Sequence, residues 1–355
     1  MNTLHVTSTT DSTGKTAIGV ALAKLAQERG ADVGYMKPKG TRLQSATGKT
    51  RDEDPLLAKE LLDLDAEVHE LEPVVYSPTF VQQALRGREN PAEIRQRVRE
   101  SFETIAAGAD LVVVEGGGDP WTGSIVDLGE PAVADLLDTR VLLAHRYERP
   151  RDADTVLDAA ARFGDRLEGV LYNVVSDPDF EALTEDVMPF LNGRGLDSLG
   201  AIPRDPGLAG VPVADLADSL GAEVVTDGAP TDGLVERYTV GAMGANSALE
   251  AFRRARNAAV ITGGDRSDVQ RSALEASGVR ALLLTGGYRP SSAVVGAAEE
   301  RGVPVLLVQT DTRTTVDRTE GVLHAGRTRS VETVSRMQEL LEANVDVDAL
   351  LALGE

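Results

Sequence analysis

The chain lacks cysteine altogether, which excludes a disulfide framework, a thiolate nucleophile and a cysteine-ligated zinc site. Its four histidines are far apart in sequence and show no metal-ligand spacing. The longest apolar runs have four to six residues, whereas a membrane-spanning helix needs about 20. The N-terminal segment has neither the basic nor the apolar region of a secretory signal. We therefore expect a cytoplasmic protein with no membrane partner.

Positive charge and aromatic residues are also scarce. The sequence has 36 Lys and Arg against 57 Asp and Glu, a formal net charge of -21, and only 4% aromatic residues. Such a surface repels nucleic-acid phosphates and anionic lipid headgroups, so neither is an expected partner. Only 6 of the 36 basic residues are Lys. This composition is typical of halophilic organisms, in which salt screens the repulsion between carboxylates.

Short β-branched runs alternate with helical stretches along the 355 residues, which predicts α/β architecture with parallel sheets. A break at Thr226–Asp232 separates two such series, because Gly, Pro and Asp cluster there without apolar residues. We predict a first domain at residues 1–225 and a smaller α/β domain at residues 233–355, which ends in a helix over Ser330–Leu341. The predicted strands are Leu4–Thr7, Val33–Met36, Leu111–Val114, Val141–Ala144, Gly169–Val174 and Leu199–Ile202 in the first domain, and Tyr238–Val240, Ala258–Ile261, Ala281–Leu284 and Val305–Val308 in the second.

The first strand runs into a loop that ends in Gly-Lys-Thr and opens a helix, which is the context of a phosphate-binding P-loop. In such a loop backbone N–H groups and the helix N-terminus hold phosphates, the lysine neutralises them, and the threonine hydroxyl ligates Mg²⁺. Thr9 stands where this motif usually has glycine, a substitution that makes a positive φ harder to adopt. The expected nucleotide-binding residues are Thr9, Thr10, Asp11, Ser12, Thr13, Gly14, Lys15 and Thr16.

A second Gly-Lys-Thr, at residues 48–50, serves as an internal comparison. No apolar strand precedes it and Arg51–Pro55 follows it in place of an amphipathic helix, so we interpret Lys49 as a loop lysine. All six lysines fall within the first 59 residues. This clustering is either a surface preference or a need for compact ammonium groups near phosphates.

Three further residues follow predicted strands at the same sheet edge as the loop. Lys37 comes after the second strand and is predicted, with Lys15, to be catalytic if the protein is an enzyme. Glu115 ends the strand Leu111–Val114 beside a run of three glycines, and Asp54 follows the second strand. With Thr16, these two carboxylates are the predicted Mg²⁺ ligands. Each could instead be a solvated turn residue.

The second domain has four loops in equivalent positions after its predicted strands. Two of them, which start at Thr262 and Thr285, lie 23 residues apart, the length of one βα unit. Because ligands bind at the carboxyl edge of parallel sheets, we expect an effector site or a subunit interface here. The alternative is that Asp265 and Arg266 cap a helix and pair with each other. The candidate residues are Gly263, Gly264, Asp265, Arg266, Thr285, Gly286, Gly287 and Asp311.

The first domain resembles dethiobiotin synthetase and its P-loop relatives. The shared features are the Thr-rich loop ending Gly14-Lys15-Thr16, Tyr35-Met36-Lys37-Pro38, Val114-Glu115-Gly116, Asn173, and Gly200-Ala201-Ile202-Pro203. The resemblance implies a P-loop NTPase-like fold that binds ATP and Mg²⁺, with Asn173 and Pro203 bordering the adenine.

With the motifs at Gly263–Asp268 and Leu284–Gly287, nearly the whole chain resembles dethiobiotin-synthetase-like proteins that carry a DRTGG domain, a pairing also found in the N-terminal region of long phosphotransacetylases. The resemblance implies an ATP-binding regulatory or sensor protein linked to acetate and acetyl-CoA metabolism. It implies no acetyl-transferase activity, since the acetyl-transferring region of those enzymes has no counterpart in these residues. Possible partners are a small-molecule effector, an acetyl-CoA-metabolising enzyme and a second copy of the chain. The alternatives are an ATP-dependent ligase of the dethiobiotin synthetase type, and an interaction scaffold whose nucleotide site has decayed.

Overall fold

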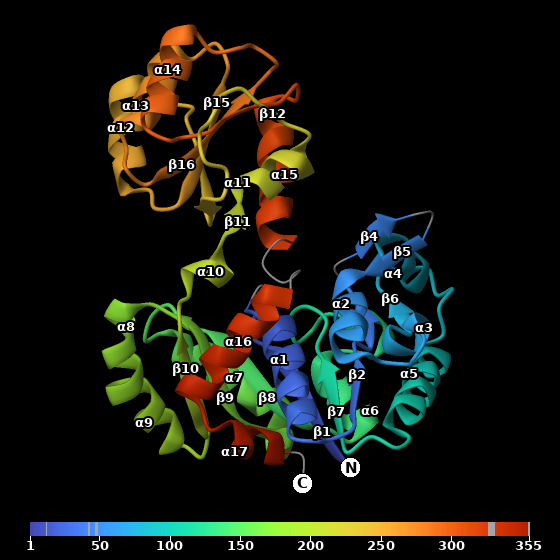
Figure 1. The fold of residues 1–355 in the computed structure, drawn as a ribbon. Helices are drawn as coiled ribbons and strands as arrows, with labels where there is room; N and C mark the ends of the chain where they lie inside the picture. The colour runs from blue at the N-terminus through green and yellow to red at the C-terminus, as the bar shows by residue number, and fades with distance from the viewer. Residues whose placement is uncertain (12, 42, 47–48, 326–330, 354–355) are drawn as a thin grey trace. The chain divides into compact units, whose positions relative to one another are not determined.

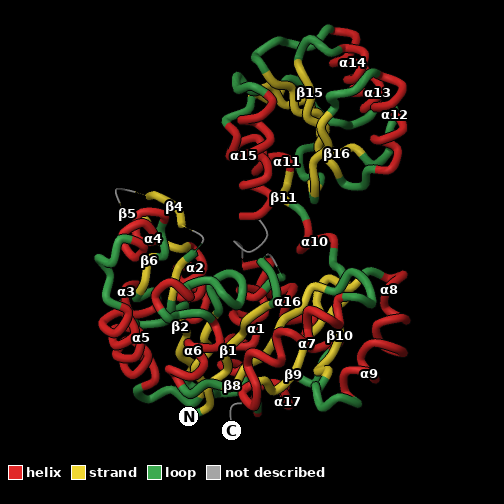
Figure 2. The backbone as a smooth tube through the Cα atoms, turned by 180° about the vertical axis from the view of Figure 1, so that it is seen from behind, coloured by secondary structure: helices red, strands yellow, loops and turns green. Residues whose placement is uncertain are grey.

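The computed structural model describes residues 1–11, 13–41, 43–46, 49–325 and 331–353, which form two compact units. Unit 1 comprises Met1–Asp205 and Thr328–Glu355, and unit 2 comprises Pro206–Arg327. Figures 1 and 2 show the two units as separate sheets, each with its own helices. None of the described helices is both long and apolar enough to cross a membrane.

Unit 1 is built around a parallel sheet of six strands in the order β10-β9-β8-β1-β7-β2. Its strands are β1 (Asn2–Ser8), β2 (Val33–Met36), β3 (Lys39–Gly40), β4 (Leu43–Ala46), β5 (Lys49–Asp52), β6 (Val74–Val75), β7 (Leu111–Glu115), β8 (Arg140–Arg146), β9 (Leu167–Val175) and β10 (Ser198–Pro203). β3 pairs with β6 in parallel, and β4 pairs with β5 in antiparallel fashion.

Helices cover both faces of this sheet. On one face α5 and α6 pack on β2 and β7, and α7 packs on β8 and β9. On the other face α1 contacts β7, and α16 contacts α1 and β10. The helices of unit 1 are α1 (Lys15–Glu28), α2 (Glu53–Leu62), α3 (Val68–Leu71), α4 (Pro78–Leu85), α5 (Pro91–Ala106), α6 (Glu130–Leu137), α7 (Asp152–Phe163), α8 (Asp177–Ala182), α9 (Met188–Asn192), α16 (Val331–Asn344) and α17 (Val347–Ala352), with the 3-10 turns η1 (Ser124–Val126) and η2 (Gly164–Arg166) and the π-helical segment η3 (Leu183–Val187).

Unit 2 has a five-stranded sheet in the order β12-β17-β16-β15-β14, in which all neighbours are parallel except β12 and β17. The strands of unit 2 are β11 (Val211–Pro212), β12 (Glu223–Val224), β13 (Leu234–Val235), β14 (Arg237–Val240), β15 (Ala258–Gly263), β16 (Val279–Thr285) and β17 (Val305–Leu307). Its helices are α10 (Pro206–Ala209), α11 (Val213–Leu220), α12 (Ala245–Arg254), α13 (Ser267–Leu274), α14 (Ser292–Glu300) and α15 (Thr312–Ala325).

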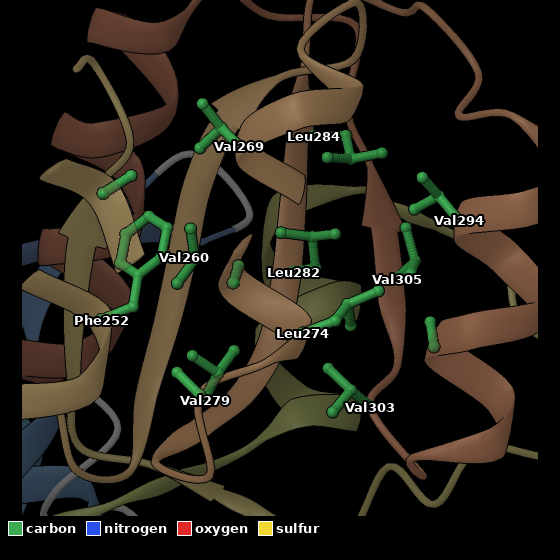
Figure 3. Packing of buried hydrophobic residues seen from close by; sticks show 14 of the residues in the cluster. Phe252, Val260, Val269, Leu274, Val279, Leu282, Leu284, Val294, Val303 and Val305 are labelled. Carbon is green, nitrogen blue, oxygen red and sulfur yellow. The ribbon is translucent and has the colours of Figure 1, made fainter. Parts of the chain in front are cut away.

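The core of unit 2 lies on both faces of this sheet. Figure 3 shows one of them, where α12, α13 and α14 pack their apolar faces on alternate residues of β15, β16 and β17. The other face is covered by α11 and α15. Alternate residues of each strand thus point into opposite layers, as expected of a parallel sheet buried on both sides. All ten predicted strands are present, and the predicted α/β fold class is confirmed.

The division of the chain differs from the predicted domains at 1–225 and 233–355. Residues 206–225 belong to unit 2, because α11 packs on its sheet. The C-terminal helices belong to unit 1 instead, because α16 lies along α1. Arg336 of α16 also donates hydrogen bonds to Asp205 at 2.7 and 2.9 Å. Unit 2 is therefore an insertion between β10 and α16, which a sequence pattern read in chain order does not reveal.

We expect Leu282→Ala to destabilise unit 2 locally. Leu282 is fully buried in β16, and removing such a side chain costs about 2–5 kcal/mol. Hydrogen exchange followed by mass spectrometry should show faster exchange in peptides from β15, β16 and β17 and unchanged exchange in β1 and β7. The exposed Val224 of the same sheet provides the control Val224→Ala, which should leave both sets unchanged. Equal acceleration in both units would contradict the division into two units.

Candidate functional site

The described residues of the loop between β1 and α1 include a glycine in a conformation that other residues rarely adopt. Gly14 caps α1 with a φ of 90°, and a Cβ there would lie 2.7 Å from Nδ2 of Asn173, so only glycine fits. Thr9 does not adopt a positive φ, so the glycine usual at that position is not needed for this loop shape. Thr10 and Asp11 are exposed, Thr13 is buried, and Ser12 lies outside the described residues.

Lys15 is buried at the start of α1, with 8% of its surface exposed. Its ammonium donates hydrogen bonds to Ser8 Oγ at 2.7 Å and to the Gly118 carbonyl oxygen at 3.1 Å. Both acceptors are neutral, and burial lowers the pKa of Lys15. An anion held at the helix N-terminus would therefore meet a desolvated positive charge.

Thr16, in the first turn of α1, is hydrogen-bonded to Glu115 at the carboxyl end of β7. The Thr16 hydroxyl donates to Glu115 Oε1 at 2.7 Å, and the Tyr35 hydroxyl donates to Glu115 Oε2 at 2.6 Å. Glu115 is 1% exposed, and burial raises its pKa although Lys37 opposes the shift. The two predicted ligands from α1 and β7 are thus adjacent.

Lys37 lies at the centre of a buried cluster of carboxylates. Its ammonium is 2.8 Å from Asp52 Oδ2 and 3.4 Å from Glu115 Oε1, and it also pairs with Asp54. Burial alone would lower the pKa of Lys37, but these carboxylates outweigh it and raise the pKa above its usual value. The structure therefore brings Lys37, Asp54 and Glu115 together. Lys37 and Glu115 lie at the ends of β2 and β7 as expected, whereas Asp54 lies in the first turn of α2 after β5 and not in a loop after β2.

Asp52 and Glu72 extend this cluster and were not expected from the sequence. The Asp52 N–H donates to both carboxylate oxygens of Glu72, at 3.2 and 3.3 Å, and Asp52 Oδ2 accepts the Thr41 N–H at 2.9 Å. Glu72 is fully buried, and burial raises its pKa to about 7. Glu72 precedes the short strand β6 and carries no motif, so no pattern pointed to it.

A second buried ion pair lies behind the three glycines that follow β7. Lys39 pairs with Glu130, whose Oε2 is 2.8 Å from His5 Nε2. Glu130 Oε1 also accepts the Gly117 N–H at 2.9 Å. Burial would raise the pKa of Glu130, but Lys39 and His5 lower it to about 2. The restriction of lysine to the first 59 residues was the one sequence signal that included Lys39.

The other predicted positions are distributed as follows. Asn173 is 3% exposed, and its amide donates to the Thr13 carbonyl oxygen at 2.8 Å, so it contacts the phosphate loop directly. Pro203 ends β10 and is half-buried.

The prediction that Lys49 is a loop lysine is wrong, because Lys49 begins β5, which pairs with β4, and α2 follows at Glu53. Lys49 is in a strand because its segment pairs with residues 43–46, a partner that the motif at residues 48–50 does not reveal.

The donor set at the first site suits Mg²⁺. Thr16, Glu115 and Asp54 offer hard oxygen ligands, and the carboxylates around Lys37 outnumber its single positive charge. Within the described residues no group of three or more His, Asp or Glu forms a ready-made metal site. Mg²⁺ of P-loop proteins takes its remaining ligands from phosphate and water, so the protein need supply only part of the shell.

In unit 2 the four loops at the carboxyl edge of the sheet contact one another. Arg266 donates to the Met243 carbonyl oxygen at 2.9 Å, and the Gly264 N–H donates to that of Thr285 at 3.1 Å. The Gly286 N–H donates to the Thr310 carbonyl oxygen at 2.9 Å. The candidate residues from β14, β15, β16 and β17 thus share one edge.

Several of these residues have structural partners. Asp311 accepts hydrogen bonds from the N–H and hydroxyl of Thr314, at 3.0 and 2.8 Å, and these bonds lower its pKa. Arg266 pairs with Asp268 at 3.3 Å, and Asp265 is exposed. Gly286 and Gly287 have positive φ values of 83° and 72°. Asp311 therefore orders the first turn of α15.

The sheet, the loop and the residues around it define a P-loop NTPase-like domain followed by a second α/β domain. The chain belongs to the family whose model, described as an AAA domain, matches residues 2–211. A second family model, the DRTGG domain, matches residues 215–322. Both parts of the resemblance drawn from the motifs are thereby confirmed.

Curated relatives include phosphate acetyltransferases and dethiobiotin synthetases. A phosphate acetyltransferase of Pseudomonas putida is 25% identical over 336 residues, covering 90% of this chain and 47% of the relative. An ATP-dependent dethiobiotin synthetase of a Parafrankia species is 30% identical over 218 residues, covering 59% of this chain and 87% of the relative. The chain spans about half the length of the phosphate acetyltransferases it matches.

One solved structure contains domains of the second type. The CBS and DRTGG domains of the regulatory region of Clostridium perfringens pyrophosphatase, complexed with diadenosine tetraphosphate, align with a TM-score of 0.27 and 19% identity. The alignment covers 40% of this chain and 72% of that one.

We expect the charge on Glu72 to destabilise the protein at high pH. Its pKa of about 7 in the folded state lies above the usual 4.5, so the unfolded chain binds fewer protons between these values. The free energy of unfolding should therefore fall as pH rises from 4.5 to 7, by about 1–3 kcal/mol from this group. Glu72→Gln removes the charge, so its stability relative to wild type should increase across that range.

Calorimetric unfolding at pH 5, 6, 7 and 8 measures this difference. The exposed Glu60 on α2 supplies the control Glu60→Gln, whose difference from wild type should not vary with pH. A difference between Glu72→Gln and wild type that stays constant from pH 5 to pH 8 would contradict the assignment.

Proposed function

We propose that unit 1 binds ATP with Mg²⁺ and that the chain acts as a nucleotide-dependent regulatory or sensor protein. The observation that carries the proposal is Lys15, a buried ammonium on neutral oxygens at the N-terminus of α1. Asp11, Glu115 and Glu130 act on this ammonium only without a direct hydrogen bond, and burial still lowers its pKa. A phosphate that accepts a hydrogen bond from Lys15 would supply a counter-charge in direct contact. The loop around Gly14 offers its backbone N–H groups to the same anion.

In this proposal Thr16, Glu115 and Asp54 would hold Mg²⁺. The ion, when bound, neutralises charge on the phosphate oxygens. Lys37 keeps Asp54 and Glu115 close together, since its ammonium contacts both. The Thr16 hydroxyl donates its proton to Glu115, which leaves the lone pairs of its oxygen available to the ion.

The regulatory role rests on the DRTGG domain in unit 2. We propose that its carboxyl edge, where the four loops meet, binds a small effector or a second copy of the chain. The phosphate acetyltransferase relatives support a link to acetate and acetyl-CoA metabolism. In this proposal the 355 residues control such chemistry and do not themselves transfer acetyl groups.

A second candidate function is an ATP-dependent ligase. It is favoured by the dethiobiotin synthetase relative, of which the chain covers 87%. Two buried lysines, Lys15 and Lys37, flank Glu115 and could stabilise the charge that develops in phosphoryl transfer. Turnover of ATP separates this candidate from the sensor.

We expect Lys15→Ala to abolish detectable ATP binding, because the variant loses the buried ammonium that faces the phosphates. Titration calorimetry with ATP and Mg²⁺ at high ionic strength, with phosphate release followed in parallel, provides the measurement. The chain offers a matched control in Lys49→Ala, from the second Gly-Lys-Thr, which should bind like wild type. Binding with negligible turnover supports the sensor, and substantial turnover supports the ligase. Absence of binding by the wild-type protein would overturn both.

We expect Glu115→Gln to reduce the dependence of ATP affinity on Mg²⁺. The amide retains the shape of the side chain but is a much poorer Mg²⁺ ligand than a carboxylate. ATP affinity in the presence of Mg²⁺ should fall about tenfold or more, by analogy with the loss of a metal-site contact, and affinity in EDTA should change little. Asp110→Asn, at the opposite end of β7, is the control. Equal losses with and without Mg²⁺ would argue against Glu115 as a ligand.

A further inference from the structure

Two buried side chains from neighbouring strands hold the phosphate loop at its two ends. His145, near the carboxyl end of β8, has its Nδ1 atom 2.8 Å from Thr9 Oγ1. Asn173, near the end of β9, donates to the Thr13 carbonyl oxygen at 2.8 Å. β8 and β9 are paired in register, with His145 opposite Tyr172 and Arg146 opposite Asn173. The loop is therefore fastened to one rigid edge of the sheet.

The contact between Thr9 and His145 is fully enclosed. Thr9 is 3% exposed and His145 is 4% exposed. The imidazole packs edge-on against the Tyr172 ring, with centroids 6.1 Å apart and planes at 90°. Burial lowers the pKa of His145, which favours the neutral ring that can exchange a hydrogen bond with a hydroxyl. Both partners thus have a fixed place before any ligand arrives.

Thr9 stands where a P-loop usually has glycine. Its hydrogen bond to His145, called the tether below, gives this threonine a function that glycine could not have. A glycine at this position makes the unbound loop flexible, and ordering it on binding costs conformational entropy. A threonine has less freedom, and its anchored hydroxyl restrains the loop further. Less entropy then remains to be lost when phosphate binds.

We propose that His145 is a positioning residue that preorganises the phosphate loop for anion binding through its hydrogen bond to Thr9. The inference rests on the proposed nucleotide site and adds to it a restraint supplied by β8. His145 is not assigned any contact with the nucleotide.

The test is a double-mutant cycle on ATP affinity with His145→Leu, Thr9→Val and the double variant. Valine has the shape of threonine without the hydroxyl. Each single variant should bind ATP about five- to tenfold more weakly, as for the loss of one buried hydrogen bond, and the double variant should be no weaker than either. His145→Asn, whose Oδ1 lies near the place of Nδ1, should recover most of the affinity. Pyrophosphate binding should fall by the same factor as ATP binding.

A control variant separates the tether from general loss of packing. Tyr147 follows β8, is 2% exposed, and shares the cluster of rings around Tyr172. Tyr147→Phe should bind ATP like wild type. Losses in the double variant that equal the product of the single losses, or the same loss in Tyr147→Phe, would overturn the proposal.

Hydrogen exchange of the nucleotide-free protein makes the test independent of the proposed function. Peptides that cover residues 8–16 should exchange faster in His145→Leu and in Thr9→Val, to a similar extent, and no faster in the double variant. If exchange is unchanged in these variants, the tether does not restrain the loop and the inference fails. If exchange behaves as expected but wild type binds neither ATP nor pyrophosphate, the proposed function fails and the restraint stands.

Discussion

The buried ammonium of Lys37 is the interaction on which the candidate site depends. It holds the carboxylates of Asp52, Asp54 and Glu115 within one desolvated cluster, although they come from different parts of unit 1. Without it, three like charges would face one another away from water, and each would repel the others or take up a proton. The carboxylates in turn keep Lys37 charged. The carboxylates proposed as Mg²⁺ ligands can therefore lie close together because Lys37 is buried among them.

The ion pair of Lys39 and Glu130 is a second case in which a buried lysine allows a carboxylate to be buried, here beside the glycines that follow β7. Its carboxylate fixes the Gly117 N–H, and the Glu130 N–H donates to the Pro120 carbonyl oxygen at 2.8 Å, so one residue fastens both ends of that loop. The carbonyl of Gly118 between them accepts the bond from Lys15. Compact ammonium groups suit these narrow sites better than planar guanidinium groups. This accounts for Lys15, Lys37 and Lys39 among the six lysines of the chain.

The parts of the structure that the sequence predicted are those set by local pattern. Apolar runs located all strands of the two main sheets except β12, and the Gly-Lys-Thr context and strand ends located Lys15, Thr16, Lys37 and Glu115. The parts that were missed depend on partners distant in sequence. Glu130 lies 91 residues from Lys39 and 125 from His5, and His145 lies 136 from Thr9. The return of α16 to unit 1 was missed for the same reason, since helical periodicity does not identify the surface on which a helix packs.

That return gives the proposed regulatory role a physical route along the chain. Unit 2 is joined to unit 1 at both of its ends, after Asp205 and before Thr328. Asp205 is bound to Arg336 of α16, and α16 lies against α1, the helix whose N-terminus forms the proposed phosphate site. In the proposed regulatory role, an effector of unit 2 that changes nucleotide affinity by some factor has its own affinity changed by the nucleotide by the same factor.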